Sequence, residues 1–218
     1  MLENVPPEET VLRYTLFERI VHWASAVVYC YLFLTGLAFY SPNLWWLAGM
    51  LGGGPTIRFW HPFAGLAFVL SVVWMWSRWR VDMALTDVDR TWWNKGVMHY
   101  IRNEDENLPP CGRFNAGQKQ FFWVMLLGGL ALLASGLVLW FTDSLPWSLR
   151  WLRYTAVIVH VIAFLCTVAG FIVHVYMGTA VVKGGFSSVL RGEVTRTWAR
   201  MHHRLWLNEV DRAKATSK

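Results

Sequence analysis

Four long stretches of this 218-residue chain contain no aspartate, glutamate, lysine or arginine, and they constrain the fold more than any other feature. They cover residues 20–57, 59–77, 120–142 and 154–182. A helix that crosses about 30 Å of hydrocarbon needs about 20 mostly apolar residues, and each stretch can supply one. Only 16% of the chain is charged, against roughly a quarter in a soluble domain. The sequence therefore predicts a membrane protein and excludes a soluble enzyme and a nucleic-acid-binding protein.

Turn and charge signals predict four transmembrane helices, at about residues 20–39, 59–77, 121–141 and 154–182. The runs Gly52-Gly53-Gly54-Pro55 and Asp143-Ser144-Leu145-Pro146 make the first and third connections short. The second connection, residues 78–119, is long and polar. We therefore predict an all-α membrane protein, with a four-transmembrane-helix bundle in residues 1–182 and a basic tail in residues 183–218.

Lysine and arginine are distributed unequally between the two predicted sides of the membrane. Residues 1–19, the loop 78–119 and the tail hold 17 of the 20, and the other side holds only Arg58, Arg150 and Arg153. Basic residues are retained in cytoplasmic segments close to membrane helices. Both termini, the loop and the tail are therefore predicted to be cytoplasmic, in a multi-pass protein of the bacterial inner (cytoplasmic) membrane.

Four of the seven histidines lie in the charge-free stretches: His22, His61, His160 and His174. Ionisable side chains inside a bilayer are functional candidates, and the alternative for any single one is a hydrogen bond to a neighbouring helix. The predicted topology places His22 and His174 near the cytoplasmic side and the other two near the outer side. His160 and His174 are 14 residues apart, which is roughly 40° short of four turns and about 21 Å along one helix face. One helix therefore offers ligands at two depths.

Two neutral imidazoles that face each other across a helix bundle are the ligands that a six-coordinate haem iron needs. We therefore predict two b-type haems, held by the pairs His61/His160 and His22/His174. Zinc is a weaker interpretation, because structural zinc sites usually have four close ligands, often including cysteine. Five small residues near the ligands leave room for a flat macrocycle, or else serve close helix packing: Gly36, Gly65, Ala163, Gly170 and Gly178.

Arginines near the predicted ligands are candidate contacts for haem propionates, which are anionic and favour guanidinium groups. Arg19 and Arg58 each precede a predicted ligand by three residues, about one helical turn, and Arg153 is a further candidate on the outer side. Retention of positive charge in the cytoplasm explains Arg19 equally well. The histidines outside the spans, His99 and the pair His202-His203, are expected on the solvated surface.

Several motifs resemble the di-haem cytochrome b, or gamma, subunit of membrane-bound respiratory formate dehydrogenase. The histidine motifs, which cytochrome b subunits of nickel–iron hydrogenases share, are Arg19-Ile20-Val21-His22-Trp23, His61-Pro62-Phe63, Arg153-Tyr154 with His160, and Val173-His174-Val175-Tyr176-Met177. The most diagnostic match is Phe114-Asn115-Ala116-Gly117-Gln118-Lys119, and a match in the tail is Gly192-Glu193-Val194-Thr195-Arg196 with Trp198 and His202-His203. The family motif usually begins Tyr-Asn, so Phe114 departs from it by lacking the hydroxyl.

The resemblance implies a membrane-anchoring subunit that passes electrons from a periplasmic iron–sulfur subunit through two b haems to a quinone near the cytoplasmic side. Formate oxidation would then belong to a molybdenum- or tungsten-containing catalytic subunit, and a higher oligomer of the complex is compatible with this. One alternative is the cytochrome b subunit of a nickel–iron hydrogenase or of another periplasmic oxidoreductase. The alternative from a different class is a haem-free membrane anchor or a transporter whose histidines relay protons.

Asn115, Gly117 and Gln118 are the predicted quinone contacts, at the cytoplasmic entrance to the third helix. A quinone carbonyl accepts hydrogen bonds, and its ring needs an apolar cleft with a few fixed polar groups. The alternative is helix-entry chemistry, in which Asn115 caps the third helix and Gly117 relaxes the turn. The resemblance favours quinone binding, and capping does not exclude it.

The unequal distribution of basic residues gives a direct test of orientation. Reporter fusions after Leu51 and after Pro146 should read as external, and a fusion after Asn107 should read as internal, because the loop 78–119 holds seven lysines and arginines. Paired alkaline phosphatase and fluorescent-protein fusions report external and internal locations, respectively. The opposite pattern at all three positions would place the His61/His160 pair on the cytoplasmic side.

Overall fold

The computed structural model describes residues 8–102 and 104–216. The first seven residues, Asn103 of the predicted loop and the last two residues of the predicted tail lie outside the described residues. The chain forms two compact units. We call Ile20–Arg78 with Phe121–Val173 the bundle unit, and the described parts of Met1–Arg19, Trp79–Gln120 and His174–Lys218 the polar unit.

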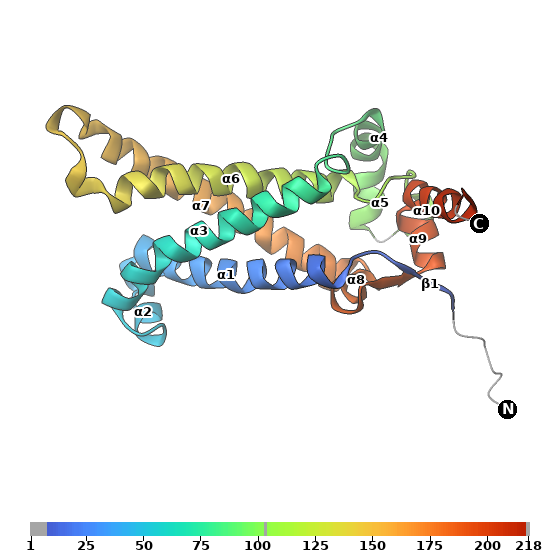
Figure 1. Cartoon of the computed structure of the whole chain (residues 1–218), viewed down its shortest axis with the longest axis horizontal. Helices are drawn as coiled ribbons and strands as arrows, with labels where there is room; N and C mark the ends of the chain where they lie inside the picture. The colour runs from blue at the N-terminus through green and yellow to red at the C-terminus, as the bar shows by residue number, and fades with distance from the viewer. Residues whose placement is uncertain (1–7, 103, 217–218) are drawn as a thin grey trace. The chain divides into compact units, whose positions relative to one another are not determined.

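Four long helices, α1, α3, α6 and α7, dominate the chain (Figure 1). Their bounds are Leu16–Tyr40, Gly54–Trp79, Ala116–Trp140 and Trp151–Tyr176. Each is long and apolar enough to cross a membrane, which confirms the predicted four-helix membrane architecture. All four helices begin before the predicted spans and include charged residues near an end. A charged residue limits burial in hydrocarbon, but it does not by itself end a helix.

Short helical turns connect the long helices of the bundle unit. The first connection contains the 3₁₀ turn η1 (Pro42–Leu44) and α2 (Trp46–Met50), and the last contains the 3₁₀ turns η4 (Thr142–Ser144) and η5 (Trp147–Leu149). Gly52 and Gly53 have φ angles of 91° and 93°. Only glycine adopts this left-handed conformation readily, so the predicted glycine turn is what lets α3 follow α2.

Aromatic rings pack between the helices of the bundle unit, and only a minority of the residues in each span are fully buried. The ring of Tyr29 in α1 lies 5.2 Å from that of Phe68 in α3 and 4.9 Å from that of Phe171 in α7. Only 17–28% of the most apolar window of each span is buried within the protein. Such exposure is unfavourable in water and favourable in hydrocarbon, which supports placing these helices in a bilayer.

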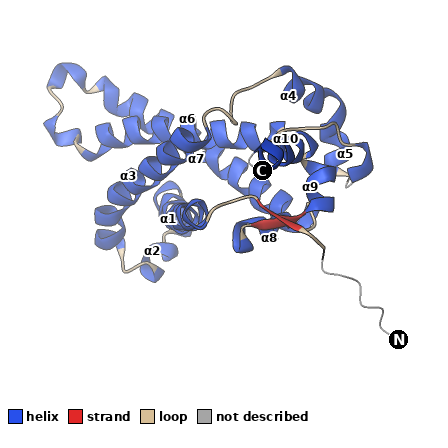
Figure 2. Ribbon diagram, turned by 45° about the vertical axis from the view of Figure 1, so that its right-hand side comes forward, coloured by secondary structure: helices blue, strands red, loops and turns tan. Residues whose placement is uncertain are grey.

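The polar unit consists of two short strands and several short helices. The strands β1 (Thr10–Leu12) and β2 (Glu193–Thr195) form an antiparallel pair (Figure 2). In this pair Val11 lies opposite Val194. Its helical segments are α4 (Asp87–Thr91), the π-helical η2 (Trp92–Gly96), α5 (Val97–Ile101), the 3₁₀ turn η3 (Asp105–Asn107), the π-helical η6 (Met177–Val181), α8 (Gly185–Arg191), α9 (Arg196–His202) and α10 (Arg204–Thr216). The segment between the second and third long helices is therefore helical from Asp87 to Ile101.

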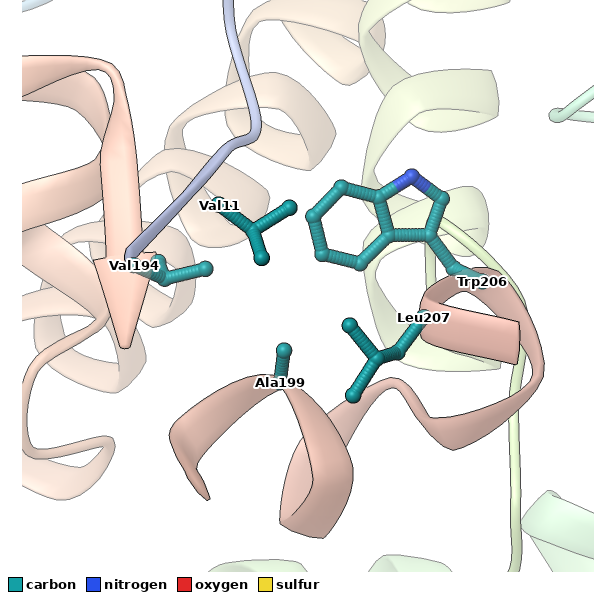
Figure 3. Close-up of a cluster of buried hydrophobic side chains, with 5 residues drawn as sticks. All are labelled: Val11, Val194, Ala199, Trp206 and Leu207. Carbon is teal, nitrogen blue, oxygen red and sulfur yellow. The ribbon is translucent and has the colours of Figure 1, made fainter. Parts of the chain in front are cut away.

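A small hydrophobic core unites the two ends of the chain in the polar unit. Val11 and Val194 point from the two strands toward Ala199, Trp206 and Leu207 of the tail (Figure 3). All five side chains are buried. The segment before α1 and the predicted tail therefore fold together, although they are separated by almost the whole sequence.

Glu18 joins three segments of the polar unit. One carboxylate oxygen accepts hydrogen bonds from the backbone N–H and the hydroxyl of Thr15, which closes the first turn of α1. The other accepts from the indole N–H of Trp79 at 2.6 Å and from the guanidinium of Arg113 at 2.9 Å. Removing one partner of such a buried ion pair is costly, because it leaves the other charge uncompensated.

The expectation that His202 and His203 are solvated surface residues is wrong. They are 6% and 1% exposed. The Nδ1 atom of His203 lies 2.8 Å from the carbonyl oxygen of Gly112, and its Nε2 atom lies 3.0 Å from a guanidinium nitrogen of Arg13. Nδ1–H therefore donates to the carbonyl, and Nε2 accepts from the arginine. Burial, and then the charge of Arg13, hold the pKa of His203 well below its usual range.

The polar unit should consequently lose stability as the pH falls from 7 to 5. In the unfolded chain His203 takes up a proton near its ordinary pKa of about 6.5, whereas in the folded unit its lowered pKa keeps it neutral. The lowered pKa thus stabilises the fold above about pH 6.5, and this contribution is lost as the pH falls from there toward the folded pKa, by at most about 1.4 kcal/mol per pH unit. Hydrogen exchange of peptides around His203, corrected for intrinsic rates, measures the change.

His203→Gln should remove this pH dependence, and His99→Gln should keep it, because the His99 side chain is 38% exposed. Equal opening free energies at pH 7, 6 and 5 in the unmodified protein would contradict the assignment.

Candidate functional site

Two of the four predicted ligands, His61 and His160, face each other in the bundle unit. His61 lies seven residues after the start of α3, and His160 lies nine residues after the start of α7. Their ring centroids are 6.4 Å apart, and the ring planes are inclined by 53°. The rings of Phe39 and His61 form a T-shaped pair with a centroid distance of 5.4 Å. The predicted pairing of these two histidines therefore corresponds to a close approach of their rings.

A hydroxyl group from another helix holds each of these rings. The Oγ1 atom of Thr35 in α1 lies 2.7 Å from Nδ1 of His61. The Oγ atom of Ser135 in α6 lies 2.9 Å from Nδ1 of His160. Neither hydroxyl was predicted from the sequence, although Ser135 is the only serine or threonine in the predicted span 121–141 and could have suggested a polar partner nearby.

The separation of the two rings fits a shared metal ion. A metal–imidazole bond is about 2 Å long, and the ring nitrogen lies about 1 Å from the ring centre. Two imidazoles on opposite sides of one iron atom therefore have centroids roughly 6 Å apart, close to the observed 6.4 Å. Because Nδ1 of each ring lies against a hydroxyl, Nε2 is the nitrogen of each ring that would bind a metal ion.

The glycines near the predicted ligands fall into two groups. A Cβ atom added at Gly36 would lie 2.7 Å from the Phe164 ring, and one at Gly170 would lie 3.4 Å from Val124, so these two serve close helix packing. Gly65, one turn after His61, and Gly178 have nothing within 4 Å of an added Cβ. Open space at Gly65 is consistent with room for a flat macrocycle beside His61.

Two further small residues complete the surroundings. Ala163, predicted near the ligands, is 7% exposed and belongs to the packed interior. Gly136 of α6 was not predicted, and a Cβ atom there would lie 3.3 Å from Cε1 of His160. Its missing side chain therefore allows α6 to approach the imidazole that Ser135 holds.

His22 and His174 lie in different units. His22 is in the second turn of α1, with its ring 5.4 Å from that of Trp23 in an edge-on arrangement. His174 is in the last turn of α7, at the boundary where the polar unit resumes. Both side chains are half-buried. Their pairing stays a prediction from the sequence.

The three predicted propionate contacts differ in their surroundings. Arg58 and Arg153 are exposed, near the starts of α3 and α7. Arg19 is half-buried, and its guanidinium donates a hydrogen bond to the carbonyl of Leu190 in α8. Arg19 therefore already serves the polar unit, and a propionate contact for any of the three stays a prediction.

Asn115 and Gln118 form a reciprocal pair at the start of α6. The backbone N–H of Gln118 donates to the side-chain oxygen of Asn115 at 2.9 Å, and the backbone N–H of Asn115 donates to the side-chain oxygen of Gln118 at 3.0 Å. Between them, a Cβ atom at Gly117 would lie 3.4 Å from that oxygen of Asn115 and 3.6 Å from the Trp92 ring. This arrangement is a capping box, so the helix-entry interpretation describes the structure. Contact of these residues with a quinone stays a prediction.

The chain matches a family model described as prokaryotic cytochrome b561 over residues 13–192. It therefore belongs to the prokaryotic cytochrome b561 family, a class of membrane cytochromes to which the four apolar helices and the facing histidines are suited. Curated relatives with more specific names match a longer part of the chain than the family model does.

The formate dehydrogenase cytochrome b556(fdo) subunit of Escherichia coli is 33% identical, over 96% of this chain and 97% of the relative. The cytochrome b556(Fdn) subunit of its nitrate-inducible formate dehydrogenase is 28% identical, over 94% of each chain. The formate dehydrogenase cytochrome b556 subunit of Haemophilus influenzae is 30% identical, over 94% of this chain and 86% of the relative. The resemblance drawn from the sequence motifs is confirmed.

Family membership and the four spans together make the chain a multi-pass cytochrome b of the bacterial inner membrane, with a b-type haem as its cofactor.

Proposed function

We propose that the chain is the membrane-anchoring di-haem cytochrome b subunit of a formate dehydrogenase complex. In this role it passes electrons from a periplasmic iron–sulfur subunit to menaquinone or ubiquinone near the cytoplasmic side of the membrane. Formate oxidation belongs to a partner subunit that contains molybdenum or tungsten. The cytochrome family, together with relatives named as subunits of formate dehydrogenases, supports this assignment.

The approach of His61 and His160 is the observation that carries the proposal. The two rings come from different helices, lie 6.4 Å apart between centroids and each present Nδ1 to a hydroxyl. A bound haem supplies a carrier that accepts and releases one electron at a time. The chain's own residues ligate it, orient the ligands and exclude water with the apolar helices around them.

A second haem is proposed for His22 and His174. The support comes from the sequence, because His174 repeats the position of His160 on the same helix face about 21 Å along the axis. Two carriers at different depths allow electron transfer across a bilayer that one carrier cannot span. Arg19, Arg58 and Arg153 are the proposed propionate contacts.

The other functions considered are less well supported. A haem-free anchor or a proton-relaying transporter does not account for membership of a cytochrome family. A hydrogenase cytochrome b subunit has similar histidine motifs, but the relatives that match more than nine-tenths of the chain are named for formate dehydrogenases.

The haem content of histidine variants tests the proposal. His61→Ala or His160→Ala should lower the content of purified protein from two haems per chain to about one, because each removes an axial ligand of one iron. His22→Ala or His174→Ala should remove the other haem, and the double variant His61→Ala/His22→Ala should contain none. Pyridine haemochrome analysis of protein that elutes normally in size-exclusion chromatography provides the numbers.

His99→Ala is the matched control, since His99 lies in the polar unit, where it pairs with Glu104. It should keep the full haem content. Two haems per chain in all four single variants would exclude the assigned ligands.

Gln118 allows capping and quinone binding to be separated. Gln118→Glu keeps an oxygen that can accept from the Asn115 N–H but removes the amide donor, whereas Gln118→Ala removes both. If Gln118 donates to a quinone, both variants should slow reoxidation of the haems by quinone, and only Gln118→Ala should also destabilise the start of α6, by about 1 kcal/mol. Stopped-flow spectra and hydrogen exchange measure the two effects.

Normal reoxidation in Gln118→Glu, combined with a destabilised Gln118→Ala, would show that Gln118 acts as a cap alone. Haem potentials measured in both variants control for the added negative charge.

A further inference from the structure

Thr35 and Ser135 hold the two facing histidines from helices that carry neither ligand. Thr35 lies in α1 and is 0% exposed, and Ser135 lies in α6 and is 5% exposed. The ligands themselves lie in α3 and α7. Each of the four long helices of the bundle thus contributes one side chain to the same small polar cluster.

The hydrogen bonds within the helices determine which way these hydroxyls point. The Oγ1 atom of Thr35 lies 2.9 Å from the carbonyl oxygen of Tyr31, and the Oγ atom of Ser135 lies 2.6 Å from that of Ala131. A carbonyl can only accept, so each hydroxyl gives its single proton to its own helix. With that proton directed at the carbonyl, the hydroxyl oxygen is an acceptor toward the imidazole, and we assign the ring proton of each histidine to Nδ1.

This assignment of protons has a chemical consequence for the ligand atoms. A neutral imidazole that is protonated on Nδ1 has its lone pair on Nε2, the nitrogen that suits the iron. Donation of Nδ1–H to an acceptor fixes the ring orientation and increases the basicity of the ligating nitrogen. A more basic ligand stabilises ferric iron relative to ferrous iron, so it lowers the reduction potential.

We propose that Thr35 and Ser135 are positioning residues that fix the tautomer of His61 and His160 and lower the reduction potential of the haem they hold. This inference rests on the proposed function, because it requires a haem on that histidine pair. The inference goes beyond the proposed function, because it assigns control of the haem reduction potential to two hydroxyls on the helices that carry neither ligand.

The same bundle supplies hydroxyls that serve as matched controls. Thr167 in α7 is 0% exposed, and its hydroxyl donates to the carbonyl of Phe164. Ser25 in α1 is 7% exposed and donates to the hydroxyl of Ser71 in α3 at 2.7 Å. Removing either hydroxyl changes the polarity and packing of the interior without removing an acceptor that faces His61 or His160.

The experiment compares Thr35→Val and Ser135→Ala with Thr35→Ser and Ser135→Thr, which restore a hydroxyl, and with the controls Thr167→Val and Ser25→Ala. Redox titration of the visible spectrum of the holoprotein in membranes gives the potential of each haem, and pyridine haemochrome analysis gives the haem content. At a fixed ambient redox potential, each loss of a hydroxyl should raise the ferrous-to-ferric ratio of one haem at least threefold. At 59 mV per tenfold change for one electron, this is about 28 mV.

The hydroxyl-restoring variants and the two controls should titrate like the unmodified protein. Loss of one haem in Thr35→Val that Thr35→Ser restores would also support the positioning role. Unchanged potentials in Thr35→Val and Ser135→Ala with both haems retained would overturn the inference, as would equal shifts in Thr167→Val. Failure of the proposed function would be distinguishable, because His61→Ala and His160→Ala would then keep the full haem content.

Discussion

Hydrocarbon offers no hydrogen-bond partners, so the polar groups inside the four long helices have to be satisfied by the protein itself. Several polar side chains of the bundle unit meet this constraint with contacts between helices. Ser25 donates to Ser71, while Thr35 and Ser135 each meet an imidazole. An unmade hydrogen bond in such surroundings costs several times what the same bond contributes at a surface. The polar contacts therefore fix how the helices associate as well as how the histidines point.

Sharing the site among all four helices has a functional benefit. His61 from α3, His160 from α7 and the hydroxyls from α1 and α6 meet only when all four helices have packed together. Imidazole rings held by packing and hydrogen bonds would need little reorganisation when the charge on a haem iron bound between them changes. A carrier that must accept and release electrons repeatedly is well served by such a rigid setting.

In the polar unit, side chains at the starts of helices cap the helix and also contact other segments. Thr15 with Glu18, Thr86 with Asp89, and Asn115 with Gln118 are each spaced as capping boxes. The acidic members also bind distant segments. Glu18 accepts from Trp79 and Arg113, and Asp89 pairs with Lys119 at 2.8 Å, so the start of α4 is tied to the first turn of α6. The proposed quinone contacts therefore sit on a helix start whose backbone is firmly held.

The membrane architecture follows from the sequence alone, and the sequence also predicts a set of four ligands. Charge-free stretches identified four spans, because ionic groups are excluded from hydrocarbon whatever the tertiary packing. Helical periodicity placed His160 and His174 on one face, and the alternation of sides predicted that His61 would meet His160. Family motifs then gave the class of protein.

Tertiary packing sets the surroundings of those histidines and determines which tail residues are buried. The hydroxyls of Thr35 and Ser135 lie 26 and 25 positions from their histidines. Arg13 and His203 are 190 positions apart. Hydrogen bonds of this kind depend on the rotation of each helix about its axis and on folding of the two chain ends together. Both are set by packing between distant segments, which local sequence patterns do not encode.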